Sequence, residues 1–118
     1  MDKFSITLPL TGEYLTTVRL TTGGICALAD FDVESTEDFK VCVTESLLIL
    51  KRNGFERATI EFTVSDMLLC DVRGEGEYGE KTESMEEEIS RALLSALLGK
   101  IEFVTNEEDR VEKISFEG

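Results

Sequence analysis

Glu45 is the side chain whose type and setting could do chemistry. It is a carboxylate among the aliphatic residues Val41, Leu48 and Ile49 on one face of an expected helix. A carboxylate in apolar surroundings can serve as a general base. A glutamate on a solvated helix face has no chemical role, and the residues alone leave both interpretations open. In either case its position depends on the helix that carries it.

That helix is predicted over Ser35–Asn53. Ser35 is expected to be the N-cap, with Asp38 three residues later completing a capping box. Gly54 is expected to take the left-handed conformation that ends many helices. Residues at spacings of three and four form an apolar face, typical of a helix packed on a core. These residues are Phe39, Cys42, Val43, Leu47 and Leu50.

Several kinds of catalytic site are excluded by composition. The sequence contains no histidine, so a histidine metal site, a Ser-His-Asp triad and a Cys-His dyad are each excluded. Cys26, Cys42 and Cys70 are odd in number, widely spaced and set among apolar residues. We predict that they are reduced core thiols, as in a cytoplasmic protein. No metal site is expected.

Length and charge indicate the class of protein. The 118 residues suit one domain over residues 1–118, and a hydrophobic content of 42% argues against disorder. The formal net charge of −13 argues against binding to nucleic acid or to an anionic membrane surface. It would favour a basic patch on a protein partner, although a solvated acidic surface is the commoner explanation. We see no signal peptide and no run of membrane-spanning length, so we expect a cytoplasmic location.

The rest of the chain alternates between strand and helix patterns. Strands are predicted over Phe4–Leu10, Ala58–Val64, Met67–Val72, Lys100–Val104 and Val111–Phe116. Two further helices are predicted near Glu13–Asp30, with a break at Gly23-Gly24, and over Ser84–Leu98. The glycine-rich, charged segment Arg73–Thr82 is expected to be a loop. The order β-α-α-β-β-α-β-β predicts a two-layer α+β sandwich, with helices on one face of a mixed, mostly antiparallel sheet.

The periodicity also predicts which side chains form the core. We expect nine apolar residues to be buried: Phe39, Val43, Leu47, Leu50, Ile60, Phe62, Leu69, Leu93 and Leu97. The stripe Ile89, Leu93, Ala96 and Leu97 of the last helix is interpreted as core rather than as an interface.

Short stretches along nearly the whole chain carry a family resemblance. They include Ile6-Thr7-Leu8-Pro9, Val43-Thr44-Glu45-Ser46, and Leu93-Leu94-Ser95-Ala96-Leu97-Leu98 followed by Ile101-Glu102-Phe103. With the order of elements, they resemble the Bergerat-type (GHKL) ATPase domain of gyrase, histidine kinases and heat-shock chaperones. More narrowly, the chain resembles the anti-sigma-factor serine kinases of bacterial partner switching. The resemblance implies the α+β fold predicted above.

The first nucleotide-binding motif of that family is Glu-x-x-x-Asn on the central helix. The resemblance gives the glutamate the role of general base and the asparagine that of magnesium ligand. Here Glu45 matches the glutamate, but Ile49 stands in place of the asparagine. An aliphatic side chain has no oxygen for magnesium, which requires hard oxygen ligands.

The second motif, Asp-x-Gly-x-Gly, follows a central strand, and its aspartate reads the adenine amino group. Asp71 matches this aspartate, whereas Arg73 replaces the first glycine, and Gly74 and Gly76 are displaced by one position. An arginine fills the space that close backbone approach requires. These four residues are interpreted as vestigial nucleotide-pocket positions.

The third motif, Gly-x-Gly, wraps the phosphates at the start of the last helix. Glu88 and Ser90 occupy those positions, with Glu86 and Glu87 alongside. Negative charge there would repel a triphosphate where the family attracts one. The segment that forms the nucleotide lid in the family is also short here.

Three altered motifs on a matching framework favour a protein that kept the fold and lost the nucleotide chemistry. The resemblance then implies an anti-sigma-factor-like regulator without ATP, with Glu45 a vestigial general-base position. Its partner would be a sigma factor or an anti-anti-sigma protein, and a homodimer is one assembly that the family implies. The surface of the former pocket is expected to include Val41, Glu45, Leu48, Ile49, Asp71 and Arg73.

Two alternatives remain open at this point. The first is an active serine/threonine kinase that uses ATP and magnesium, in which Glu45 deprotonates the substrate hydroxyl and Asp71 reads adenine. The second is an α+β domain unrelated to the family, in which Asp71 ends a strand and Glu86 to Glu88 supply N-terminal helix charge.

Overall fold

The computed structural model describes residues 2–98 and 100–118. Their strands are β1 Asp2–Pro9, β2 Phe55–Val64, β3 Leu68–Tyr78, β4 Ile101–Thr105 and β5 Val111–Glu117. Their α-helices are α1 Leu15–Leu28, α2 Val33–Arg52 and α3 Met85–Leu97, and a 3-10 turn, Gly12–Tyr14, precedes α1. Within the described residues, no helix is both long and apolar enough to cross a bilayer.

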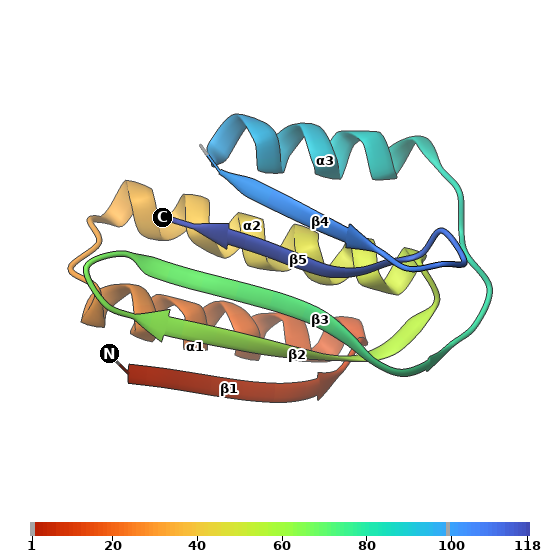
Figure 1. Ribbon diagram of the computed structural model, residues 1–118. Helices are drawn as coiled ribbons and strands as arrows, with labels where there is room; N and C mark the ends of the chain where they lie inside the picture. The colour runs from red at the N-terminus through yellow and green to blue at the C-terminus, as the bar shows by residue number, and fades with distance from the viewer. Residues whose placement is uncertain (1, 99) are drawn as a thin grey trace.

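The described strands form one sheet in the order β1-β2-β3-β5-β4, and every pairing between them is antiparallel, so the mostly antiparallel sheet that was expected has no parallel pair among them. The helices lie on one face of it, with α1 and α2 behind the sheet and α3 along the β4 edge (Figure 1). The predicted two-layer α+β architecture with helices on one face is therefore confirmed, and it is compatible with a GHKL-like ATPase fold. β5 is inserted between β3 and β4, although β4 precedes it in the chain.

Helix α2 is the centre of the helical layer. It packs on β2, β3 and β5, while α1 lies against one of its sides and α3 against the other. Six of the residues predicted to be buried are at most 2% exposed, as the helix and strand periods require. They are Phe39, Val43, Leu47, Leu50, Ile60 and Phe62.

The ends of α2 are determined by local chemistry. The predicted N-cap, Ser35, is wrong: Asp32 is the N-cap, because its backbone is extended and its carboxylate accepts a hydrogen bond from the Ser35 N–H at 2.7 Å. That bond lowers the pKa of the Asp32 carboxyl. At the other end Gly54 has φ 95°, as predicted, and an added Cβ would lie 2.5 Å from the Gly79 carbonyl oxygen.

Two leucines predicted to be buried are exposed. Leu69 is 39% exposed, because Leu68 and Cys70 on either side of it face the helices and successive strand residues alternate between faces. Leu93 is 37% exposed, because α3 turns a different side toward the core, burying Ser90 and Leu94. Leu97 is half-buried.

Two predicted irregularities are regular secondary structure instead. The loop expected at Arg73–Thr82 is strand as far as Tyr78, because the start of β2 pairs with it and satisfies its backbone groups. The break expected at Gly23-Gly24 does not occur, and α1 is continuous there. Packing of α1 against α2 outweighs the weak helix propensity of the glycine pair.

The position of Leu47 in the layer interface gives a stability prediction. Leu47→Ala is expected to lower the free energy of unfolding by about 2–5 kcal/mol, because a cavity remains between α2 and the sheet. Leu20→Ala removes the same atoms from a side chain that is 72% exposed, so a change within about 0.5 kcal/mol is expected. Urea denaturation of both variants measures the difference, and equal losses would contradict the placement of α2.

Candidate functional site

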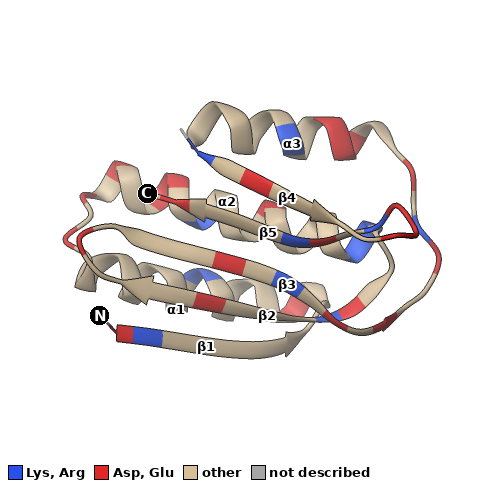
Figure 2. Ribbon diagram, viewed as in Figure 1, with Lys and Arg blue, Asp and Glu red and all other residues tan. Residues whose placement is uncertain are grey.

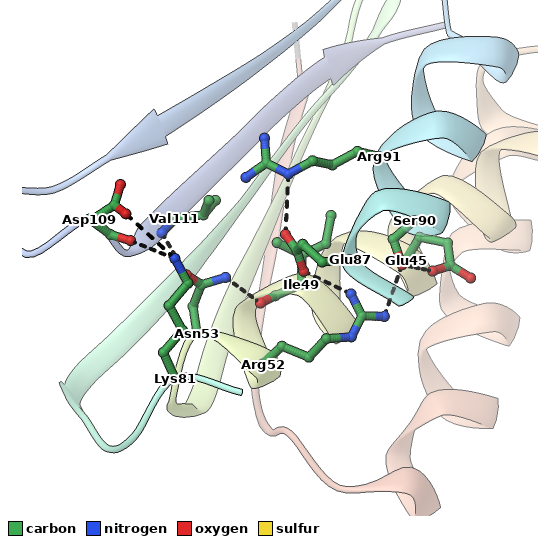
Figure 3. A network of polar contacts seen from close by, with 10 residues as sticks. All are labelled: Glu45, Ile49, Arg52, Asn53, Lys81, Glu87, Ser90, Arg91, Asp109 and Val111. Atoms are coloured by element: carbon green, nitrogen blue, oxygen red, sulfur yellow. Dashed lines mark hydrogen bonds and ion pairs between the residues drawn. The ribbon is translucent and has the colours of Figure 1, made fainter. Parts of the chain in front are cut away.

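Glu45 lies on the side of α2 that faces α3, and it is half-buried. The Ser90 hydroxyl donates a hydrogen bond to Glu45 Oε2 at 2.6 Å. Arg52 Nη2 in turn donates to Ser90 Oγ at 2.9 Å, and Arg52 Nη1 to Glu87 Oε1 at 2.9 Å (Figure 3). The carboxylate that could act as a base is therefore bound to the neighbouring helix.

The contacts continue to the edge of the sheet. Arg91 Nε donates to Glu87 Oε2 at 3.3 Å, and the Arg91 guanidinium lies 4.5 Å from the centre of the Phe103 ring on β4. We call the five residues Glu45, Arg52, Glu87, Ser90 and Arg91 the α2–α3 polar network. The network contains two carboxylates and two guanidinium groups, so its negative and positive charges are equal in number. Partly buried charges require such pairing.

Near the end of α2, Ile49 and Asn53 also hold the fold together. The side chain of Ile49 is fully buried, so it faces the core and not a pocket. Asn53 is 1% exposed, donates to the Ile49 carbonyl at 2.8 Å and accepts from the Val111 N–H at 3.0 Å (Figure 3). Its amide therefore joins α2 to β5.

Asp71 and Arg73 lie on the opposite side of the sheet from Glu45. They alternate along β3 with the buried Cys70 and Val72, so they belong to the face that the helices leave open. On that face Asp71 lines a cleft that also includes Glu61 and Glu102, and Arg73 Nε donates to Glu75 at 3.1 Å. The structure does not bring Glu45 and Asp71 together.

The two glycines of the second motif also occupy different settings. Gly74 lies beneath an aromatic ring, since an added Cβ would be 2.4 Å from the Phe55 ring. Gly76 is exposed in a left-handed conformation with φ 76°. The space beside Gly74 is therefore filled by a side chain of the protein itself.

The N-terminal end of α3 borders a strongly acidic cleft. Glu83, Glu87 and Glu88 line it, opposite Lys81. Lys81 Nζ is also occupied, since it donates to the Asp109 carbonyl at 3.0 Å. Figure 2 shows the resulting run of acidic residues over the connector and the first turns of α3. A helix N-terminus favours anions, but the three glutamates in the first turn of α3 already place negative charge there.

The three cysteines offer no reactive thiolate. All are free and buried. Burial raises the pKa of the Cys26 thiol to about 11 and that of the Cys42 thiol to about 12, and it also raises the pKa of the Cys70 thiol well above its ordinary value. The three thiols are therefore neutral near pH 7, whereas nucleophilic chemistry requires the thiolate. Across residues 2–98 and 100–118, no group of three or more Cys, Asp or Glu side chains is arranged to hold a metal ion.

Sequence reasoning did not identify the α2–α3 polar network. Arg52 stands at the end of its helix, where a cation complements the helix dipole, and Glu87 is one of several acidic residues in the first turn of α3. A signal was present, because Glu87, Ser90 and Arg91 are three and four residues apart and so share one side of α3. Their partner helix could not be inferred from that spacing.

Comparison with known proteins agrees with part of this picture. No protein-family model matches the chain. It is similar to the serine-protein kinase RsbW of Listeria monocytogenes serotype 4a, with 31% identity over 68 residues, which are 53% of this chain and 43% of that protein. The serine-protein kinase RsbW of Listeria innocua serovar 6a is 34% identical over 55 residues, or 47% of this chain and 35% of that protein. The chain thus matches less than half the length of these relatives.

The bond between Glu45 and Ser90 can be measured by a double-mutant cycle. Glu45→Gln and Ser90→Ala should show a coupling energy of about 1 kcal/mol in unfolding, because the first removes the charge that strengthens the hydrogen bond and the second removes its donor. Glu37, an exposed glutamate earlier on α2, supplies the control. Glu37→Gln with Ser90→Ala should be additive within about 0.5 kcal/mol. Additivity of the first pair would show that the bond contributes nothing.

Proposed function

We propose that this protein is an anti-sigma-factor-like regulator, a single cytoplasmic domain that binds a protein partner without binding ATP. The similarity to serine-protein kinases over about half the chain supports the class of regulator. The α+β fold, with helices on one face of an antiparallel sheet, is compatible with it. The partner is a sigma factor or an anti-anti-sigma protein.

The observation that carries the loss of nucleotide chemistry is the α2–α3 polar network. A general base must be free to reach the proton of its substrate, whereas Glu45 accepts a 2.6 Å hydrogen bond from Ser90, which Arg52 holds in place. The two helices are thereby joined on the side of α2 that carries Glu45.

The negative charge and the lack of space at the motif positions also oppose ATP binding. ATP brings several negative charges, which a binding site normally offsets with a metal ion, backbone N–H groups and glycines. Here Ile49 offers no metal ligand, and Glu88 adds negative charge at the start of α3. Phe55 fills the space beside Gly74. Glu45, Asp71, Arg73, Gly74 and Gly76 are accordingly proposed as vestigial positions.

The second candidate function is an active serine/threonine kinase that uses ATP and magnesium. The name of the matched relatives, serine-protein kinase, favours it. It would require Glu45 to exchange Ser90 for a substrate hydroxyl. Asp71 would have to reach the nucleotide from the other face of the sheet.

Calorimetric titration with ATP and magnesium separates the two candidates. We expect no binding at cellular ATP concentrations, because the combined losses of about 4 kcal/mol weaken affinity roughly a thousandfold. Ile49→Asn combined with Arg73→Gly should recover little, since Glu88 remains. If ATP binds with a dissociation constant near 1 μM and Asp71→Ala abolishes that binding, the kinase is supported instead.

Partner binding is tested by titrating the protein with each purified sigma factor and anti-anti-sigma protein of the source bacterium. One of them is expected to bind with a dissociation constant of about 1 μM or tighter. Its affinity should be the same with and without ATP and magnesium, which is the internal control. If every one of these proteins binds more weakly than about 100 μM, the proposed function is wrong.

A further inference from the structure

Part of the apolar surface of α3 is exposed, although Leu94 is buried and Leu97 packs partly against the core. Met85, Ile89 and Leu93, each four residues apart, share one stripe and are 78%, 58% and 37% exposed. The side that faces inward instead carries Glu87 and Ser90 with Leu94. A helix on a protein surface normally turns its apolar stripe inward and its charged side to water. Here part of the apolar stripe is exposed, while Glu87 and Ser90 face inward.

This orientation of α3 is held in place by specific contacts. Arg52 binds Glu87 and Ser90, and Ser90 binds Glu45, so the polar side of α3 is fixed against α2. Burying the stripe against α2 would require turning the helix. These hydrogen bonds would then break and leave charges without partners. The stripe is therefore a stable feature of the surface.

The stripe continues toward α2. The two helices run antiparallel, as Glu87 lies opposite Arg52 and Ser90 opposite Glu45. Val41, one turn before Glu45, is therefore at the level of Leu93, and its side chain is 38% exposed. We define the α3 stripe as Met85, Ile89, Leu93 and this valine. It is about 12 Å long from residue 85 to residue 93, which is the contact length of a packed helix of two to three turns.

The charges around the α3 stripe indicate the chemistry of what covers it. Glu86 and Glu88 flank it on α3, and Glu37 lies one turn beyond Val41; all three are exposed. Figure 2 shows acidic residues in the first turns of α3 and near the start of α2. A second copy would bring the same carboxylates together, on chains that each carry a net charge of −13. Like charges in an interface cost free energy, whereas a cationic partner is attracted.

We propose that the α3 stripe binds a cationic amphipathic helix of a partner protein. Apolar side chains of that helix pack between Ile89, Leu93 and Val41, and its Lys or Arg side chains pair with the flanking carboxylates. The inference deepens the proposed function, because it assigns the chemistry and the surface of partner binding. It rests on the orientation of α3, which does not depend on whether ATP binds.

A model peptide tests the surface directly. The probe is a fluorescent peptide of about 18 residues composed of Leu and Lys, with Leu at helical spacing, titrated at about 150 mM salt to screen diffuse attraction. Ile89→Ser with Leu93→Ser should weaken binding at least tenfold. The matched control is Leu20→Ser with Leu28→Ser, which removes two leucines that are 72% and 71% exposed on α1. It should change the affinity less than twofold. Circular dichroism should show that both variants keep the wild-type helix content, since the four side chains are exposed.

Each other outcome would overturn the inference. Equal weakening in the two double variants, or none in either, would mean that the peptide responds to net charge and not to the α3 stripe. Absence of peptide binding to the wild-type protein would exclude a cationic helix as the occupant. Self-association of the wild-type protein that Ile89→Ser with Leu93→Ser abolishes would show that a second copy covers the stripe.

The natural partner distinguishes this inference from the proposed function. A sigma factor or anti-anti-sigma protein that binds the wild-type protein should bind the Ile89→Ser, Leu93→Ser variant at least tenfold more weakly. If it binds the variant equally well, the α3 stripe is not the partner surface, while the proposed function stands.

Discussion

The structure depends on the burial of α2 between a sheet and two other helices. Its apolar side, with Phe39, Val43 and Leu47, covers the central strands of the sheet, and the hydrophobic effect is the main favourable term in such a layer contact. The side toward α3 is different, since Glu45 and Arg52 meet the partner helix through hydrogen bonds. One helix thus supplies the core of the domain through one surface and fixes the rotation of α3 through another. That rotation decides which part of α3 meets water.

Periodicity predicted which residues share a side of an element, and it succeeded where one side alone is apolar. The buried surface of α2 and the inward residues Ile60 and Phe62 of β2 follow from spacing. It failed for Leu93, because α3 has an apolar side and a polar side that can pair with α2, and spacing does not say which one turns inward. The strand character of residues 73–78 was missed for a related reason. Pairing with β2 is a tertiary contact that overrides the local preference of a glycine-rich segment.

The candidate site shows what motif spacing can and cannot determine. Glu45 was placed correctly on the central helix, but its partner Ser90 lies on another helix and could not be inferred from the sequence of α2. Asp71 and Gly74 belong to one strand, where a shift of one residue moves a side chain to the other face. The displacement of the glycines by one position therefore changes which layer they meet. It places Gly74 against Phe55 on the helix side, while Asp71 and Arg73 face outward.

The insertion of β5 has a consequence for biosynthesis. A ribosome releases β3 and β4 before β5, so for part of translation the nascent chain presents β3 with one edge unpaired, and β4 cannot join the sheet. Unpaired edges invite pairing with other chains, and non-local pairing closes slowly because the intervening chain must first be ordered. The residues of β3 that pair with β5 are Leu69 to Arg73, so this is the edge that stays open. It carries Asp71 and Arg73, and charged side chains on an open edge disfavour pairing with a foreign strand. The two charged side chains that face away from the helices thus lower the risk of aggregation while β3 waits for β5.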